Sequence, residues 1–244
     1  YISLFMNLVL DLGNTNVKWA ILRDNKIIDY EIIRDFSLLE LSKIRLKYPS
    51  INHVCCAKSG VFSQSIEKFC KEFKIKYLEV NHLCHLPIDI DYDTPKSLGP
   101  DRIALCVGAH MTVPGNNLII DIGTCITCDL LINNKYMGGQ ISPGIYMRLN
   151  SLHKNTANLP KLNFEIISKD IGKTTKDSIL IGVYEGILFE LEGIIQKHKL
   201  RYPDINVFLT GGDREFFKKS IKHINFINPY LLMEGLNYII AFNE

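Results

Sequence analysis

The 244-residue sequence lacks the features of a membrane, secreted or nucleic-acid-binding protein. No apolar run approaches the roughly 18 to 20 residues that a membrane-spanning helix needs, and no cationic segment with an apolar core and a cleavage site opens the chain. Lysine plus arginine number 28 against 26 for aspartate plus glutamate, so no excess of one charge attracts nucleic acid or an anionic membrane. We therefore expect a cytoplasmic protein that acts on a small molecule, without a nucleic-acid or membrane partner.

Several common catalytic signatures are absent as well. The histidines are scattered, and neither a G-x-S-x-G elbow nor a Walker phosphate loop occurs. The seven cysteines are an odd number in a chain long enough to bury a core without disulfides, so most are predicted to be reduced core thiols. Cys125 and Cys128 form a lone C-x-x-C, which leaves a redox or zinc site as an alternative. No matching C-x-x-C or histidine pair accompanies it.

One short phrase occurs twice in the sequence. Residues 8–16 read LVLDLGNTN and residues 118–126 read LIIDIGTCI, so each apolar run ends in an aspartate, an apolar residue and a glycine. A buried strand with this ending can hold a metal-bound phosphate, because glycine lets backbone N–H groups approach the anion closely. Two copies at this separation predict two homologous halves with facing phosphate loops.

The same succession of predicted elements follows each copy. Two strand-like runs surround a polar turn at residues 24–26, and two more surround the turn at residues 133–135. An ordinary hairpin remains the alternative for either copy alone, because D-x-G is frequent in turns. A matched strand and hairpin around both copies argue against chance.

The duplicated unit resembles the actin-like ATPase superfamily of sugar kinases, Hsp70 and actin. Ordered motifs narrow the resemblance to the type III pantothenate kinase family: DLGNTNVK at 11–18, GPDR at 99–102, DIGTCIT at 121–127, GGQISPG at 138–144, TANLP at 156–160, and Thr175 ahead of Gly182 and Gly186. The resemblance implies an α/β protein made of two duplicated ribonuclease H-like (actin-like ATPase) domains with a central cleft, at residues 1–112 and 113–244.

The resemblance also implies an activity, ATP-dependent phosphorylation of pantothenate to 4′-phosphopantothenate in the first step of coenzyme A biosynthesis. It implies Mg²⁺ and a monovalent cation, K⁺ or NH₄⁺, and a homodimer with the active site near the interface. Two alternatives stay open. One is a kinase of the same superfamily acting on another small molecule, since the phosphate loops are shared across it. The other is a non-catalytic nucleotide-binding regulator.

The two phosphate loops supply the predicted ATP and metal contacts. Asp11 would hold Mg²⁺ directly or through water, because Mg²⁺ prefers oxygen ligands and keeps much of its hydration. The resemblance assigns the monovalent cation to Asp121, while the sequence by itself leaves a second Mg²⁺ contact open there. The predicted ATP-binding residues are Asp11, Leu12, Gly13, Asn14, Thr15, Asn16, Val17, Lys18 and Thr124.

The G-P-D-R motif supplies the predicted catalytic base. The resemblance implies that Asp101 takes the proton of the pantothenate hydroxyl and that Arg102 holds the substrate, and an arginine fork suits a carboxylate. Helix capping is the alternative for an isolated aspartate at the start of a predicted helix. The predicted substrate-binding residues are Tyr92, Gly99, Pro100, Asp101, Arg102 and Thr175.

The second half of the chain contains a long predicted helix at residues 176–199. Gly182 and Gly186 lie inside it, although a helical glycine costs about 1 kcal/mol relative to alanine, so their spacing predicts close approach of another backbone. A strand at 207–210 then leads into Gly211-Gly212-Asp213, which resembles the adenosine-side loop of the superfamily. We predict a further helix from there to about His223.

Overall fold

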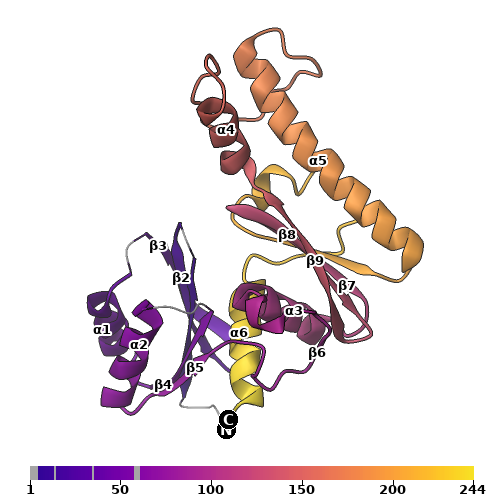
Figure 1. Ribbon diagram of the computed structural model, residues 1–244. Helices are drawn as coiled ribbons and strands as arrows, with labels where there is room; N and C mark the ends of the chain where they lie inside the picture. Colours follow the sequence, from indigo (N-terminus) through magenta and orange to yellow (C-terminus); the bar gives the residue numbers. More distant parts are fainter. Residues whose placement is uncertain (1–4, 14, 35, 58–60) are drawn as a thin grey trace. The chain divides into compact units, whose positions relative to one another are not determined.

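The computed structural model describes residues 5–13, 15–34, 36–57 and 61–244, and the chain divides into two compact units (Figure 1). Unit 1 contains Tyr1–Pro114, Asn134–Tyr136 and Tyr230–Glu244, and unit 2 contains Gly115–Asn133 and Met137–Pro229. Both units are therefore discontinuous in sequence. The expected division into two homologous domains at residues 112 and 113 stays a prediction.

Unit 1 is built on a five-stranded sheet with the strand order β3-β2-β1-β4-β5. Its strands are β1 (Met6–Leu12), β2 (Val17–Arg23), β3 (Lys26–Ile33), β4 (Ile51–Ala57) and β5 (Lys76–Glu79), and the short strand β6 (Asp89–Ile90) lies outside this sheet. Its helices are α1 (Leu38–Lys47), α2 (Val61–Glu72), α3 (Pro100–Thr112) and α6 (Leu231–Phe242), with a 3-10 turn at Pro95–Ser97.

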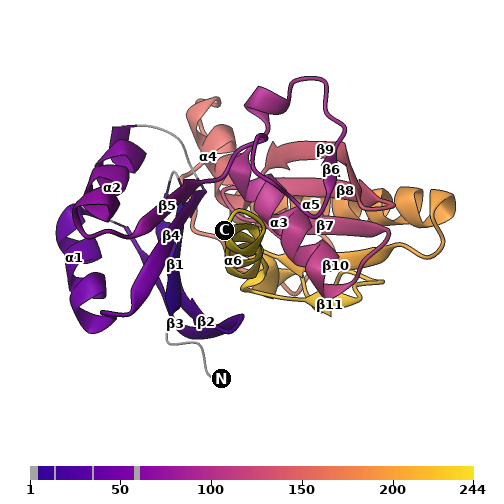
Figure 2. The same cartoon turned by 90° about the horizontal axis from the view of Figure 1, so that it is seen from below.

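Apolar side chains point to both faces of the sheet in turn along β1, which explains why helices cover both faces. Leu8 and Leu10 of β1 share a core with Leu41 of α1 and Ile66 of α2. Val9 lies between the two leucines, points to the opposite face, and is buried where α6 contacts β1 and β4. Figure 2 shows α1 and α2 on one side of these strands and α6 on the other.

Unit 2 holds the second sheet, in which β11-β10-β7-β8-β9 are neighbours. The elements are β7 (Asn117–Ile122), β8 (Cys125–Ile132), β9 (Lys135–Pro143), α4 (Ile145–Lys154), α5 (Thr175–Arg201), β10 (Asn206–Thr210), a 3-10 turn at Arg214–Phe216, and β11 (Phe226–Ile227). The chain of β9 begins in unit 1, where Asp89 of β6 pairs with Lys135. Side chains of β7, β10 and α5 form one apolar core.

The backbone repeats itself at the two predicted hairpins. Asp24 and Asn25 join β2 to β3 with φ of 48° and 60°, and Asn133 and Asn134 join β8 to β9 with φ of 50° and 64°. Two consecutive left-handed residues are the hallmark of the tight hairpin turn that matches the twist of its strands, and asparagine and aspartate tolerate that conformation. The duplicated strand and hairpin read from the sequence are confirmed.

The last helix belongs to unit 1 because two glycines let it lie directly against α3. A Cβ atom on Gly108 of α3 would stand 2.5 Å from the carbonyl oxygen of Leu231, and a Cβ atom on Gly235 of α6 would collide with the carbonyl oxygen of Ala104. Only glycine at both positions permits this approach. Within the part of the chain that the structure describes, no helix is both long and apolar enough to cross a membrane.

Candidate active site

The first phosphate loop connects β1 to β2 and begins at Asp11. The antiparallel register places Asp11 opposite Lys18, and Lys18 Nζ lies 3.3 Å from Asp11 Oδ2. Leu12 and Val17 form the next pair and close the ladder beneath the loop. A Cβ atom on Gly13 would stand 2.7 Å from the carbonyl oxygen of Asn16, so the loop can turn this tightly only with glycine.

The carboxylate of Asp11 is enclosed, whereas the loop beyond it is open to solvent. Asp11 is 9% exposed, Gly13 and Thr15 are exposed, and Asn16 is half-buried. Asn14 lies outside the described residues. A buried carboxylate with a lysine beside it, followed by exposed backbone, provides both a metal ligand and anion-binding groups.

The second phosphate loop connects β7 to β8 and is clamped by Gly144, the residue before α4. The Gly123 N–H donates to the Cys125 carbonyl at 2.9 Å, and the Gly144 N–H donates to the Thr124 carbonyl at 3.1 Å. A Cβ atom on Gly144 would collide with the carbonyl oxygen of Gly123. The Ser142-Pro143-Gly144 turn, which ends the GGQISPG motif, therefore brings its backbone against the loop that carries Thr124.

Asp121, at the end of β7, lies against the glycine-rich turn that follows β10. Gly211 has φ of +97°, and a Cβ atom there would collide with both Asp121 Oδ1 and the Ile122 carbonyl oxygen. The Asp213 N–H donates to the same Ile122 carbonyl at 2.9 Å, and burial raises the pKa of the Asp213 carboxyl. Two oxygen atoms thus converge on a glycine that no other residue can replace.

The G-P-D-R motif forms the start of α3. Gly99 is the N-cap residue, Pro100 occupies the first helical position, and Asp101 stands in the first turn. Asp101 Oδ1 lies over Gly99, where a Cβ atom would collide with it. Asp101 is half-buried and Arg102 is only 5% exposed. Since the cap position belongs to Gly99, capping in the strict sense does not account for Asp101.

Arg102 and Tyr92 both contact Tyr136, a residue that no sequence motif singles out. The Arg102 Cζ atom lies 5.8 Å from the centroid of the Tyr136 ring, and the Tyr92 and Tyr136 rings are 5.9 Å apart and inclined by 59°. Two backbone contacts hold Tyr136 in this position. Ile90 of β6 pairs with Tyr136, and the Asp91 N–H donates to the Tyr136 carbonyl at 2.9 Å. All of these residues belong to unit 1.

Thr175 lies in unit 2, at the first position of α5. It is exposed and lines a cavity of about 1000 Å³ between α4 and α5, and Thr174 caps the helix by accepting a hydrogen bond of 3.0 Å from the Asp177 N–H. The other lining residues include Pro143, Met147, Arg148, Leu152 and Gly182. The structure thus groups Thr175 with α4, and groups Tyr92 with Arg102 in the other unit.

The two cysteines of the C-x-x-C sequence point in different directions. Cys125 is exposed, with its Sγ atom 3.7 Å from Met147 Sδ, whereas Cys128 is buried in the core of unit 2. Residues three apart on a strand face opposite sides of the sheet, so these thiols do not share a site. The other cysteines are buried or half-buried, and burial raises the pKa of the Cys70 thiol to about 12.

The chain is similar in sequence to type III pantothenate kinases. A family model described as type III pantothenate kinase matches residues 7–197. A type III pantothenate kinase from Christiangramia forsetii is 39% identical over 242 residues, which cover 98% of this chain and 99% of that protein.

Solved structures with a similar fold are more distant in sequence. A conserved Baf family protein from Campylobacter jejuni, described as a transcriptional activator, superposes with a TM-score of 0.64 at 21% identity, covering 96% of this chain and 97% of that one. A ROK family protein from Streptococcus pneumoniae gives 0.52 at 12% identity, covering 97% and 99%. At such identities the likeness shows the fold alone, and it confirms the predicted α/β fold of the actin-like class.

Proposed function

Because the chain belongs to the type III pantothenate kinase family, we propose that it transfers the terminal phosphoryl group of ATP to pantothenate. The products are 4′-phosphopantothenate and ADP, in the first step of coenzyme A biosynthesis. The observation that carries the proposal is the family match over residues 7–197, which spans both phosphate loops, the G-P-D-R motif and Thr175. ADP release that depends on pantothenate, with the phosphorylated product identified by mass spectrometry, tests it.

Phosphoryl transfer spreads negative charge over oxygen atoms, so the protein must supply fixed donors, a metal and an aligned nucleophile. The first loop fits the first two needs: Asp11 would hold Mg²⁺ directly or through water, and residues 12–18 would contact the phosphates of ATP with Lys18 as a point charge. No cluster of three or more acidic, histidine or cysteine side chains occurs among the described residues. Mg²⁺ is held by one or two carboxylates plus phosphate and water, so Asp11 would be a sufficient protein ligand, and the ion would neutralise phosphate charge when bound.

The second loop would serve ATP and a monovalent cation. Thr124 is the proposed ATP contact, and Asp121 the proposed ligand for K⁺ or NH₄⁺. Support comes from the carboxylate of Asp121 near the end of β7, beside the Gly211 turn, since oxygen atoms are what a hard cation binds.

At the start of α3, Asp101 would accept the proton of the pantothenate hydroxyl as the hydroxyl oxygen attacks the phosphorus atom. Arg102 would hold the pantothenate carboxylate by paired hydrogen bonds, and its burial strengthens such a pair by excluding water. Tyr92, Gly99, Pro100 and Thr175 complete the proposed substrate contacts.

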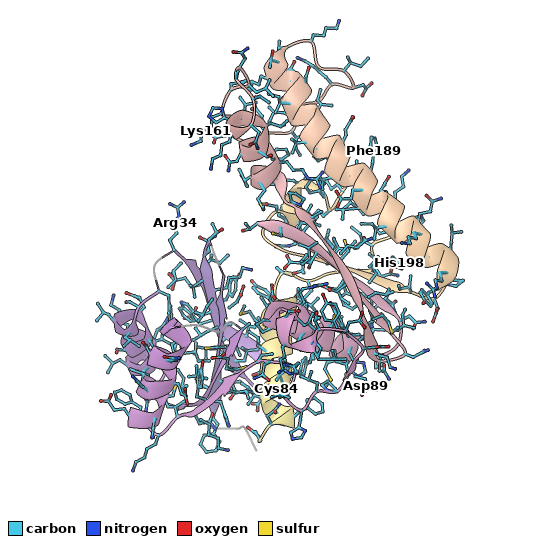
Figure 3. The ribbon with its side chains drawn as sticks, in the orientation of Figure 1. Arg34, Cys84, Asp89, Lys161, Phe189 and His198 are labelled. Atoms are coloured by element: carbon cyan, nitrogen blue, oxygen red, sulfur yellow. The ribbon has the colours of Figure 1, made fainter. Side chains whose placement is uncertain are left out.

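We also propose a cytoplasmic homodimer, with the exposed stripe of α5 in the interface. Gly182, Phe189, Gly193 and Leu200 lie along one side of α5; Phe189 is 62% and Leu200 78% exposed, and Phe189 projects outward (Figure 3). Atoms added as Cβ to Gly182 or Gly193 would meet nothing within 4 Å, so these glycines leave room for another chain. A two-fold pair is the commonest closed assembly. A fully active monomer in light scattering would reject this assembly.

A further inference from the structure

One carboxylate on α5 holds both sides of the turn between β9 and α4. Ser142 Oγ donates to Glu190 Oε1 at 2.5 Å, and Arg148 Nη2 donates to Glu190 Oε2. Arg148 Nε also donates to the Pro143 carbonyl at 2.8 Å. Glu190 thereby fixes the last residues of β9 and the first turn of α4 at once.

The turn fixed in this way is the one that clamps the second phosphate loop. Gly144, which follows Pro143, donates its N–H to the Thr124 carbonyl and packs so closely on Gly123 that a Cβ atom would not fit. The Arg148 N–H in turn donates to the Gly144 carbonyl at 3.0 Å. Contacts this tight transmit a displacement of the turn directly to the backbone of Gly123 and Thr124.

The hydrogen bonds that Glu190 accepts are partly shielded from water, and one of them is charge-assisted. The side chains of Arg148 and Glu190 are 22% and 29% exposed, so water screens the ion pair less than it screens a pair on the open surface. Both carboxylate oxygens accept hydrogen bonds, one of them from a guanidinium, and such charge-assisted bonds are about twice as strong as neutral ones.

We propose that Glu190 is a positioning residue for nucleotide binding, acting through Ser142, Arg148 and Gly144 on the loop that carries Thr124. The inference rests on the proposed function, in which Thr124 contacts ATP. Glu190 itself is not among the proposed substrate contacts. It positions the second phosphate loop although it lies on α5, a helix whose sequence carries no nucleotide-binding motif.

The test compares Glu190→Ala with Glu192→Ala, a matched control that removes a different glutamate carboxylate from the same helix. Misplacing a binding group by about 1 Å costs up to roughly 100-fold, so a partial shift in Glu190→Ala should raise KM for ATP about 10-fold. KM for ATP should rise more than KM for pantothenate in Glu190→Ala, although Arg148 and Thr175 line one cavity. Both constants should be unchanged in Glu192→Ala. Glu190→Gln, which keeps the size but loses the charge, should give a smaller rise.

Equilibrium titration with ATP provides a measurement that does not depend on turnover. Weaker ATP binding by Glu190→Ala, with normal binding by Glu192→Ala, would support the inference. A lower melting temperature or kcat with unchanged ATP affinity would overturn it, as would equal rises in both KM values. If wild-type protein shows no pantothenate-dependent ADP release, the proposed function fails, and the ATP titrations still decide the role of Glu190.

Discussion

The guanidinium of Arg102 lies over the ring of Tyr136, with Cζ 5.8 Å from the ring centroid and the two residues 5% and 1% exposed. An aromatic face within about 6 Å of a cation attracts it, most strongly where water is excluded. Tyr136 therefore restricts the directions in which Arg102 can present its hydrogen-bond donors. This contact links a residue of the G-P-D-R motif to the first residues of β9.

Replacing Tyr136 should change pantothenate binding according to whether the aromatic ring is kept. Loss of a buried cation–π contact is worth about 0.5 to 2 kcal/mol, so Tyr136→Leu should raise KM for pantothenate about 2- to 30-fold. Tyr136→Phe keeps the ring and should remain within about twofold. Steady-state kinetics with saturating ATP checks both variants, and equal KM values for the Leu and Phe variants would contradict the contact's role.

Arg102→Gln should weaken pantothenate binding and leave the affinity for ATP unchanged. A contact with the substrate carboxylate is similar in the ground state and the transition state, so its loss raises KM rather than lowering kcat. A lost hydrogen bond to a charged group is worth about 1.5 to 3 kcal/mol, which predicts a rise of roughly 10- to 100-fold. The measurement is KM for each substrate. An increase confined to ATP would reject the assignment.

Asp121→Asn should remove the stimulation of activity by K⁺ or NH₄⁺. The substitution deletes one charge beside Gly211 while keeping the size of the side chain, so the fold should persist in circular dichroism. Activity of the wild-type protein should fall sharply when Na⁺ or Tris is the sole monovalent cation. Full wild-type activity under those conditions would rule out a monovalent site at Asp121.

Stability should decrease as the pH falls below about 6.5, because burial lowers the pKa of His53, His110 and His198. A histidine with a lowered pKa in the folded state binds its proton more readily when unfolded, so acid favours unfolding. For His53, the nearby Glu244 opposes this effect and Lys76 adds to it. Urea unfolding at pH 7.5 and 5.5 should show a smaller loss for His53→Gln than for the wild type, and identical losses would exclude His53.

Local patterns accounted for the elements that carry both phosphate loops. The strands, the Asp-x-Gly loops and the Asn133–Asn134 turn follow from residues close in sequence, and the predicted helix at 176–199 is observed as Thr175–Arg201. The contact of Arg102 with Tyr136 and the return of α6 to α3 could not be predicted, because they join distant segments whose pairing no local pattern specifies.

The predicted helix running to about His223 was wrong. Only Arg214–Phe216 forms a 3-10 turn, although Phe217 and Ile221 are buried at a helix-like spacing. The Tyr184 hydroxyl of α5 bonds to the Ser220 hydroxyl at 2.6 Å, and Tyr184 stacks on Phe217. The segment that contains Phe217 and Ser220 therefore packs on α5 with an irregular backbone, although its apolar spacing favours a helix.

The most direct test of the account is kcat of Asp101→Asn with pantothenate and ATP both saturating. If Asp101 takes the proton of the pantothenate hydroxyl, kcat should fall by roughly 10² to 10⁴, with pantothenate binding retained, as expected for a lost general base. The fold should be unchanged, since asparagine keeps the size of the aspartate side chain in the first turn of α3. A correctly folded Asp101→Asn protein with near-normal kcat would contradict the catalytic role of Asp101.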